Sequence, residues 1–426
     1  MKIERFRVQN YKNLKDVRLE GLSDINVFFG QNSVGKSNVF EALALALWLL
    51  NARKKPSGKG VVVISLKDVY QKLAIAAPIM PLDGNGPIAF QVTIRWEDRD
   101  VAGQVAVRGS TTDTKSNIPP ETRLICHIRI EQESKDEIAS SVDYSWENNE
   151  GHFVHFPGEN LLPFVPHLHT IHAYRRLGIE RRESSNGSKA VSHYNLKQAL
   201  FYAYLSSNLQ QKRRLEAVRR ILAEPPFEIG LLDVSLHPET DEIDIGFVRP
   251  DGRLTIESLG SGFQQLLLVL GQVFLNDSPI VALEEPEMNL SPQYQQHLLT
   301  ALRRLMQDPA VALEQLFIST HSPYFEFAEN FYDVTLDKQG HTQITRATTA
   351  EHTRHFAIAP LGPETGARLN SLNQIQLYQG VLDDLQLQRG DMVFFVKDEA
   401  GHWEIQPERE VLGAMKTAWS DNGGGE

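Results

Sequence analysis

A short stretch near the N-terminus has the residue types and spacing of a phosphate-binding loop. In FFGQNSVGKS, Gly30 is followed five residues later by Gly35, and Lys36 and Ser37 come directly after, which fits G-x-x-x-x-G-K-[ST]. Such a loop wraps backbone N–H groups around phosphates, and the helix beginning there adds a partial positive charge. We therefore expect Lys36 to reach the β- and γ-phosphates of a nucleotide and the Ser37 hydroxyl to bind Mg²⁺. The residues expected to hold the phosphates are Gly30, Gln31, Asn32, Ser33, Val34, Gly35, Lys36, Ser37 and Asn38.

Two adjacent glutamates follow an apolar run much later in the chain. In PIVALEEPEMNLSP, four apolar residues predict a buried strand, and Glu284 and Glu285 stand at its exit. A carboxylate pair is costly near a core unless a cation or a proton transfer requires it. We expect Glu284 to bind Mg²⁺ through water and Glu285 to act as general base on the attacking water. The alternative is a solvated strand end with two surface glutamates.

A histidine and a glycine-rich segment complete the set of candidate residues. His321 follows the apolar run of LFISTHSP, where the carboxyl edge of a sheet meets a ligand, so it is either a sensor of the γ-phosphate or a structural histidine. The segment SLGSGFQQ places Gly260, Ser261 and Gly262 directly before an apolar helix. Taken alone this is an ordinary helix entry. Beside a phosphate loop and a two-glutamate strand, it is a phosphate-sensing signature.

Composition limits the class of protein. The 426 residues carry a net charge of −11 and 41% hydrophobic residues, as expected for a soluble globular protein. The longest apolar runs are far shorter than the roughly 20 residues that span a bilayer, and the N-terminus does not resemble a signal peptide. Cys126 is the only cysteine, so no intrachain disulfide forms, which fits a reducing cytoplasm.

Basic residues gather in one segment despite the acidic net charge. Between Arg175 and Arg220 the chain has eleven Lys and Arg residues against three glutamates, a local charge of +8. The segment could neutralise DNA phosphates, or it could be a solvated helical face or an interface with an acidic partner. The nearby His167, His169 and His172 do not predict a metal site, because strand alternation places His172 on the opposite face from the other two.

Hydrophobic patterns predict an α/β fold. We expect strands at 3–9, 14–20, 88–96, 104–108, 122–131, 228–236, 242–248, 280–283 and 316–320, with LHTIHAY as another candidate strand. We expect a surface loop or insertion at 131–150, and helices at 195–224 and 292–306. A strand before Gly30 and a helix after it flank the phosphate loop. A hairpin is expected around DKQGH. The expected parts of the chain are 1–60, 61–174, a basic helical insertion at 175–226, 227–350, and an extension at 351–426.

The order of these motifs resembles the ABC-type ATPases of the SMC/RecF/OLD group. Lys36 and Ser37 match the Walker A motif of that family, Glu284 and Glu285 the Walker B pair, His321 the switch histidine, and PEMNLSP the D-loop region. The fold implied is a P-loop NTPase of ABC-head type, a mixed central sheet with an antiparallel β subdomain and an inserted helical subdomain. Residues 385–405 resemble a strand-hairpin of stand-alone OLD-like ATPases.

The chain departs from the family pattern at several positions. Glu284 stands where the family usually has Asp, and Gly260 replaces the serine at the second signature position, so Ser261 or the backbone N–H groups of 260–262 are expected to contact the phosphate. Gln91 is the candidate for the glutamine loop. After His321 the chain lacks the acidic pattern of the Toprim nuclease module.

The resemblance implies an ATPase that uses ATP and Mg²⁺ and forms a head-to-head homodimer or a larger oligomer of such heads. In such dimers the phosphate loop of one head faces the signature of the other. A stand-alone head resembles the ATPase subunits of prokaryotic anti-phage systems such as PARIS or Septu, which control a separately encoded effector such as a nuclease. The alternatives are a RecF-like DNA-repair ATPase and a nucleotide-gated scaffold with negligible hydrolysis.

Overall fold

The computed structural model describes residues 1–52, 61–73, 75, 78–81, 86–95, 122–154, 165–173, 175–182, 195–225, 227–325, 330–347, 386, 393–397 and 403–407. The chain divides into two compact units, 1–347 and 348–426, each of which is described by itself. The strand expected at 104–108 and most of the extension at 351–426 lie outside the described residues.

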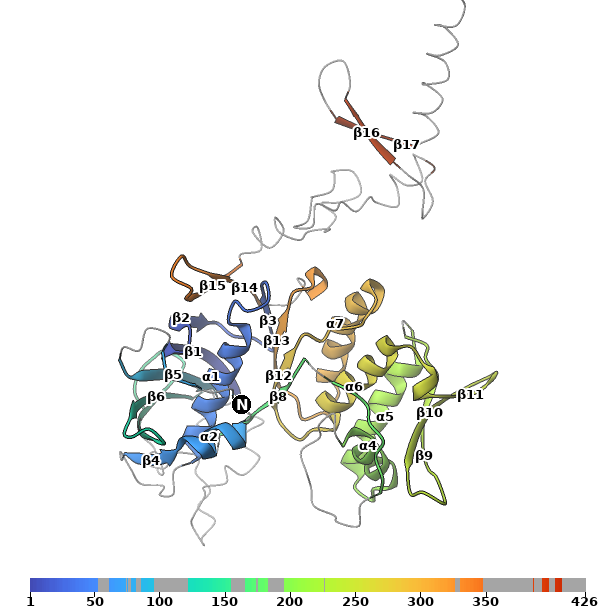
Figure 1. The fold of residues 1–426 in the computed structure, drawn as a ribbon, viewed down its shortest axis with the longest axis horizontal. Helices are drawn as coiled ribbons and strands as arrows, with labels where there is room; N and C mark the ends of the chain where they lie inside the picture. Colours follow the sequence, from blue (N-terminus) through green and yellow to red (C-terminus); the bar gives the residue numbers. More distant parts are fainter. Residues whose placement is uncertain are drawn as a thin grey trace, which may run out of the picture. The chain divides into compact units, whose positions relative to one another are not determined.

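A mostly parallel sheet forms the centre of the first unit (Figure 1). Its order is β15 (Thr342–Arg346), β14 (Asn330–Leu336), β3 (Ile25–Phe29), β13 (Gln315–Thr320), β12 (Ile280–Glu284) and β8 (Leu168–Ile171). All neighbouring strands pair in parallel except β15, which pairs antiparallel with β14 as the hairpin predicted around DKQGH. The apolar runs of β3, β12 and β13 are buried, as is typical of parallel strands covered on both faces. Because the strands are parallel, the carboxyl ends of β8, β12, β13 and β3 meet at one edge.

An antiparallel sheet forms the second layer. Its order is β2 (Leu14–Glu20), β1 (Lys2–Tyr11), β5 (Ile88–Arg95), β6 (Arg123–Gln132), β7 (Glu137–Glu147) and β4 (Val62–Ser65). Helix α1 (Lys36–Asn51) contacts strands of both sheets and is buried on most of its surface, and α2 (Leu66–Leu73) packs against it. The two sheets and α1 share one hydrophobic core. This core fixes the start of α1, and therefore the phosphate loop, relative to the parallel strands.

The surface loop predicted at 131–150 is wrong. These residues contain β7, which pairs with β6 on one side and β4 on the other. Ile138, Val142 and Trp146 point into the core, and the serine at 140 is buried among them. The strand was missed because its acidic and hydroxyl residues outnumber the apolar ones that alternate with them.

A helical lobe stands beside the parallel sheet (Figure 1). It contains α4 (Leu196–Leu205), α5 (Leu209–Ala223), α6 (Ser261–Leu275) and a meander of β9 (Leu231–Leu236), β10 (Ile243–Arg249) and β11 (Gly252–Thr255). Helix α7 (Pro292–Met306) follows β12, as predicted. The single helix expected at 195–224 is wrong, because the backbone of Ser206 is extended and the side chain of Asn208 caps a second helix.

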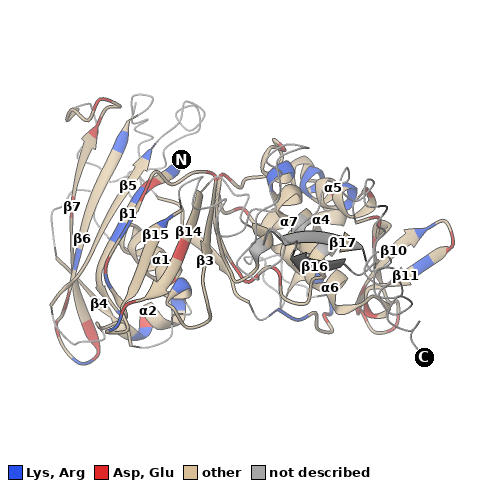
Figure 2. Ribbon diagram, turned by 90° about the horizontal axis from the view of Figure 1, so that it is seen from above, with Lys and Arg blue, Asp and Glu red and all other residues tan. Residues whose placement is uncertain are grey.

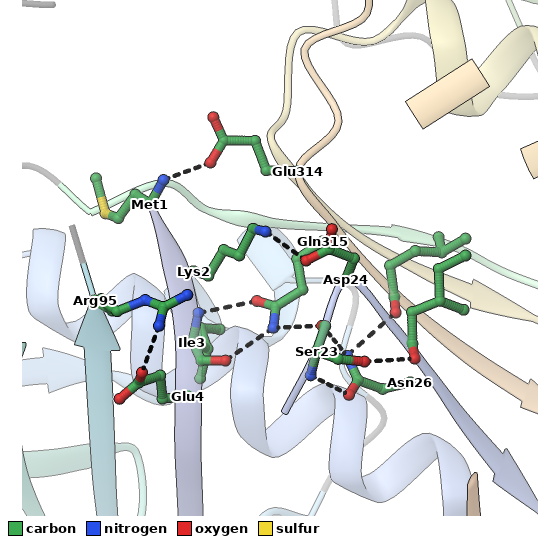
Figure 3. Close-up of polar contacts among 12 residues, drawn as sticks. Met1, Lys2, Ile3, Glu4, Ser23, Asp24, Asn26, Arg95, Glu314 and Gln315 are labelled. Atoms are coloured by element: carbon green, nitrogen blue, oxygen red, sulfur yellow. Dashed lines mark hydrogen bonds and ion pairs between the residues drawn. The ribbon is translucent and has the colours of Figure 1, made fainter. Parts of the chain in front are cut away.

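Buried amides join the two sheets (Figure 3). Gln315, at the start of β13, accepts a hydrogen bond from the backbone N–H of Ile3 and donates to the carbonyl oxygens of Ile3 and Ser23. Asn26 of β3 caps the turn before its own strand through the backbone of Ser23. These bonds satisfy polar groups in the core and fix the register of β3 and β13, the strands that lead to the candidate site.

The fold class expected from the sequence is confirmed by this architecture: a P-loop head with a mixed sheet, an antiparallel β layer and a helical lobe. In the second unit, β16 (Val393–Lys397) and β17 (Trp403–Pro407) pair antiparallel, so the hairpin expected within 385–405 is present, ending two residues later. Among the described helices, none is long and apolar enough to cross a membrane.

The cap of α5 gives a testable prediction for the helical lobe. The Asn208 side chain accepts hydrogen bonds from the backbone N–H groups of Gln210 and Gln211. Replacing Asn208 by Ala leaves these donors unpaired, which should lower the free energy of unfolding by about 1 kcal/mol. Urea unfolding at constant transition slope measures the change. Asn208→Asp keeps an acceptor oxygen and should retain wild-type stability; equal loss in both variants would contradict the capping role.

Candidate nucleotide-binding site

The phosphate loop runs from the end of β3 into α1, and its glycines are required by close packing. A Cβ atom on Gly30 would lie 2.3 Å from the carbonyl oxygen of Val334 in β14. Gly35 has φ +101°, and a Cβ there would lie 2.2 Å from Thr342 Oγ1. Both glycines therefore let the loop lie directly against the β14–β15 hairpin, and Gly35 also provides a left-handed turn that other residues rarely adopt.

The back of the loop is held by hydrogen bonds from two distant turns. Asn38 donates to Asn13 Oδ1 over 2.7 Å, and the backbone N–H of Thr342 donates to the Asn13 carbonyl over 2.9 Å. The Thr342 hydroxyl donates to the carbonyl of Val34 over 2.8 Å. The loop is thus preorganised by its surroundings, with Lys36 and Ser37 at the first turn of α1.

Lys36 is 6% exposed, and its ammonium group donates to the carbonyl oxygens of Gly30 and Gln31 inside its own loop. Burial lowers the pKa of Lys36, while the charges of Glu285 and Glu287 act in the opposite direction. The ammonium is therefore held at the mouth of the loop, with carboxylates across the cavity.

The two predicted metal-binding residues lie together. Glu284, at the end of β12, accepts a hydrogen bond from the Ser37 hydroxyl and another from His172 Nδ1 at 3.1 Å. Burial raises the pKa of Glu284, but the hydrogen bonds from His172 and Ser37 outweigh burial and hold the pKa below its usual value. The described residues contain no cluster of three or more His, Cys, Asp or Glu that could hold a metal by themselves. A hydroxyl and a carboxylate fit Mg²⁺, which commonly takes few protein ligands and completes its shell with water and phosphate.

Glu285 has an unusual backbone conformation. Its φ is 41°, in the left-handed region, and its N–H donates to the carbonyl of Ser319 in β13 over 2.8 Å. Non-glycine residues seldom occupy this backbone region. They do so where surrounding contacts enforce the conformation, often at functional sites. The turn places the Glu285 side chain beside Glu284 in the wall of one cavity.

That cavity has a volume of about 220 Å³. The residues that line it come from the phosphate loop, the ends of β12 and β13, and the segment after β8. They are Gln31, Asn32, Ser33, Gly35, Lys36, Ser37, Asn38, Ala173, Glu284, Glu285 and Ser319. Of the residues expected to hold phosphates, Gly30 and Val34 lie in the same loop but not in the lining.

His321 is positioned by a carboxylate that sequence reasoning missed. Glu287 is 4% exposed and accepts from the Thr320 hydroxyl at 2.6 Å and from the His321 backbone N–H at 2.9 Å. His321 Nδ1 lies 3.3 Å from a Glu287 oxygen and 3.9 Å from a Glu285 oxygen. The third glutamate of Glu-Glu-Pro-Glu was the available signal, since it shares a motif with two predicted site residues.

Arg175 was also missed as a site residue, because its place in the basic segment suggested a surface role. Its guanidinium, 4% exposed, donates to the carbonyl oxygens of His172, Glu284 and Glu285 at 3.0, 2.8 and 2.7 Å. Burial lowers the pKa of Arg175 to about 10, so the group stays charged at neutral pH. The signal that could have found it is the strand LHTI, which ends at the same sheet edge as β12.

The glycine-rich segment lies at the start of α6, outside the lining of the cavity. Gly260 precedes the helix, and Ser261 and Gly262 form its first turn. A Cβ atom on Gly262 would lie 2.9 Å from the Asn289 carbonyl, so the helix start packs on the D-loop region. A Cβ on Gly260 would meet no atom within 4 Å. The candidate for the glutamine loop, Gln91, lies within β5 opposite His127 and not at the cavity.

Most of the basic segment is paired within the chain, although Figure 2 shows Lys and Arg gathered along α5. Apart from Arg175, six of its residues form ion pairs with acidic residues. The pairs are Arg181–Glu242, Arg182–Asp241, Lys197–Glu257, Arg214–Asp277, Arg219–Glu216 and Arg220–Asp308. Lys189 lies outside the described residues. The local charge of +8 therefore overstates the positive charge that this face can offer to DNA.

A protein family described as "AAA domain, putative AbiEii toxin, Type IV TA system" matches residues 25–327, more than two thirds of the chain. An uncharacterized protein of Methanocaldococcus jannaschii is 28% identical over 134 residues, 32% of this chain and 16% of that protein. An ATP/GTP phosphatase of Helicobacter pylori is 44% identical over 41 residues, 10% of this chain and 11% of that protein. The DNA replication and repair protein RecF of Lactococcus lactis is 37% identical over 43 residues, 10% of this chain and 12% of that protein. The chain thus matches less than a fifth of the length of each of these relatives.

Solved structures of SMC heads are similar in architecture. The SMC head domain from Thermotoga maritima has a TM-score of 0.40 and 14% identity, covering 82% of this chain and 100% of that chain. An SMC head bound to the C-winged helix domain of ScpA has a TM-score of 0.45 and 13% identity, covering 82% of this chain and 99% of the other.

The His172–Glu284 pair predicts a pH-dependent stability. The hydrogen bond with Glu284 raises the pKa of His172 above 6.5, although burial acts in the opposite direction. The contribution of His172 to the stability of the fold is therefore fully present below pH 6.5 and is lost as pH rises through the raised pKa. The pKa of Glu284 lies below 4.5, so its contribution is present above 4.5 and is lost as pH falls through the lowered value. The thermal midpoint of His172→Gln should fall furthest below wild type between about pH 4.5 and 6.5, and should converge with wild type as pH rises through the raised pKa of His172. A difference between the two thermal midpoints that stays constant as pH rises well above 6.5 would contradict the ion pair.

Proposed function

This chain belongs to the AAA-domain family that matches residues 25–327, and we propose that it binds Mg-ATP and hydrolyses it to ADP and phosphate. The observation that carries the proposal is the common lining of one cavity by Lys36, Ser37, Glu284 and Glu285. These residues come from the start of α1 and the end of β12, which are far apart in the sequence. They supply a phosphate-binding cation, oxygen ligands for a metal and a base.

Each of these groups has a role in phosphoryl transfer to water. Bound at Ser37 and Glu284, Mg²⁺ would neutralise charge on the β- and γ-phosphates. Lys36 would exchange its loop carbonyls for phosphate oxygens, and the N-terminus of α1 would add N–H donors. Glu285 would accept the proton of the attacking water, and His321, oriented by Glu287, would face the γ-phosphate.

The proposed active form is a head-to-head homodimer. The signature residues Gly260, Ser261 and Gly262 lie outside the lining of the cavity in their own chain. A second chain can bring its α6 N-terminus to the cavity, where partial positive charge and N–H groups stabilise the γ-phosphate. On this proposal the dimer contains two composite sites, each with a phosphate loop from one chain and a signature from the other.

We further propose that ATP-driven dimerisation controls a separately encoded effector, such as a nuclease or toxin, in cytoplasmic anti-phage defence. The motifs resemble those of stand-alone OLD-like ATPases, and the family description refers to a Type IV toxin–antitoxin system. The test is co-purification of native complexes with wild-type protein and Glu285→Gln in the presence of ATP. A nuclease or toxin retained by both forms supports the role; recovery of the homodimer alone contradicts it.

A RecF-like DNA-repair ATPase is the second candidate function, favoured by the segment shared with RecF of Lactococcus lactis. It requires tight, ATP-dependent and salt-sensitive binding to DNA. Fluorescence anisotropy with duplex DNA at two salt concentrations separates the two functions. The internal ion pairs of the basic segment lead us to expect weak binding that ATP does not strengthen.

Replacing Glu285 by Gln tests the proposed base. The amide cannot accept a proton, so kcat for ATP hydrolysis should fall by about 10²–10⁴-fold, while ATP binding and dimerisation persist. Phosphate release and light scattering measure the two properties. Lys36→Ala is the comparison variant and should lose ATP binding itself. Wild-type hydrolysis as slow as that of Glu285→Gln would instead favour the nucleotide-gated scaffold.

Two adjacent positions test the signature. Ser261→Arg places a long side chain at the α6 N-terminus and should abolish ATP-dependent dimerisation and hydrolysis while leaving ATP binding to the single chain intact. Gly260→Ser is the matched control: its Cβ has open space, and a serine before the helix adds a capping hydroxyl, so this variant should dimerise at least as well as wild type. Normal dimerisation of Ser261→Arg would show that the segment is only a helix entry.

A further inference from the structure

A chain of buried hydrogen bonds joins the signature helix to the turn that carries Glu285. Gln265 lies on α6, four residues after Ser261, and is 8% exposed. Its amide nitrogen donates to the carbonyl oxygen of Arg175 over 2.8 Å, and its amide oxygen lies 3.4 Å from Arg175 Nε. The other side of the same guanidinium holds the carbonyls of Glu284 and Glu285.

Arginine is suited to this place because of its shape. Its guanidinium is planar and presents several N–H donors in fixed directions, so one group can hold two successive carbonyls and also meet an amide oxygen. A lysine ammonium cannot reproduce this geometry. Through these contacts, a shift of α6 along its axis would move Gln265 and Arg175, and with them the carbonyls of Glu284 and Glu285.

We propose that Arg175 and Gln265 are positioning residues that couple the signature of a chain to the Walker B turn of the same chain. The inference rests on the proposed dimeric ATPase. In that dimer the signature of one chain binds the nucleotide held by the other, whereas Glu285 acts on the nucleotide of its own chain. The Gln265–Arg175 link therefore transmits nucleotide binding at one composite site to the base at the second site.

The consequence is positive cooperativity between the two composite sites. With a nucleotide at only one site, one chain has an engaged signature but no substrate before its own Glu285. With both sites filled, each α6 is held against a nucleotide and each Glu285 turn is fixed. ATP hydrolysis should therefore depend on ATP concentration with a Hill coefficient above one.

Gln265→Met tests the link with little change in volume. It removes both hydrogen bonds to Arg175 but touches neither Glu284 nor Glu285. We expect kcat to fall on the order of tenfold, because small displacements of a positioned group are costly. The Hill coefficient should fall below the wild-type value. ATP affinity of the single chain should not change. Arg175→Lys should have the same effects, because lysine keeps the positive charge but lacks the planar set of N–H donors that holds the two carbonyls.

The matched control is Gln272→Met on the same helix. Gln272 is 2% exposed, and its amide donates to the carbonyl of Leu268 within α6. This variant loses a buried hydrogen bond donated by a glutamine side-chain amide, but it changes no contact of Arg175. Its thermal midpoint should fall about as far as that of Gln265→Met, while kcat and the Hill coefficient stay at wild-type values. Equal kinetic losses in both variants would reduce the effect to general destabilisation of α6.

Dimers of two different variant chains show in which chain the loss of the Gln265–Arg175 link lowers turnover. One chain carries Glu285→Gln, so hydrolysis occurs only before the Glu285 of the second chain. Gln265→Met placed in that second chain should lower turnover, whereas the same change in the Glu285→Gln chain should not. Equal effects from both placements would overturn the proposal. If the wild-type protein neither dimerises with ATP nor hydrolyses it, the proposed function itself is wrong. If the wild-type protein is active and Gln265→Met has the same kcat and Hill coefficient, only the Gln265–Arg175 link is wrong.

Discussion

The hydrogen bonds from the Arg175 guanidinium to the carbonyl oxygens of Glu284 and Glu285 hold together the edge on which the rest of the site depends. The parallel pairing of β8 with β12 brings Arg175 to this position, and the pairing of β12 with β13 supplies the Ser319 carbonyl that binds the Glu285 N–H. A buried cation with several donors and a neighbouring strand thus enforce a backbone conformation that glutamate rarely adopts. The direction of the Glu285 side chain follows from these constraints and not from its own flexibility.

Charge balance at the same edge explains why cations surround it. Glu284 ends β12, Glu285 and Glu287 follow it closely, and Glu287 is almost fully buried. Carboxylates at this density are stable only beside compensating positive charge. Lys36 and Arg175 supply fixed charges, and His172 is hydrogen-bonded to Glu284. A nucleotide brings further negative charge, so Mg²⁺ bound at Ser37 and Glu284 would restore the balance when ATP occupies the cavity.

The sequence predicted those parts of the site whose geometry is local. The spacing of Gly30, Gly35 and Lys36 encodes the loop, because its curvature depends on glycines at fixed places, and apolar runs marked β3, β12 and β13. Arg175 and Glu287 were not predicted, because their roles arise from strands and turns that meet only in the folded sheet. The strand β7 and the break at Ser206 were missed for another reason. Acidic and hydroxyl residues, the buried Ser140 among them, hid the alternation of the first. The apolar pattern of α4 and α5 continues across the second.

The central claim is that each chain contributes half of two ATP sites. The most direct measurement is specific ATPase activity as a function of protein concentration, made alongside light scattering in saturating Mg-ATP. Because one chain lacks the signature at its own cavity, activity per chain should be near zero at concentrations where the protein is monomeric and should rise in step with the fraction of dimer. Activity per chain that stays constant while the protein is monomeric would contradict the claim.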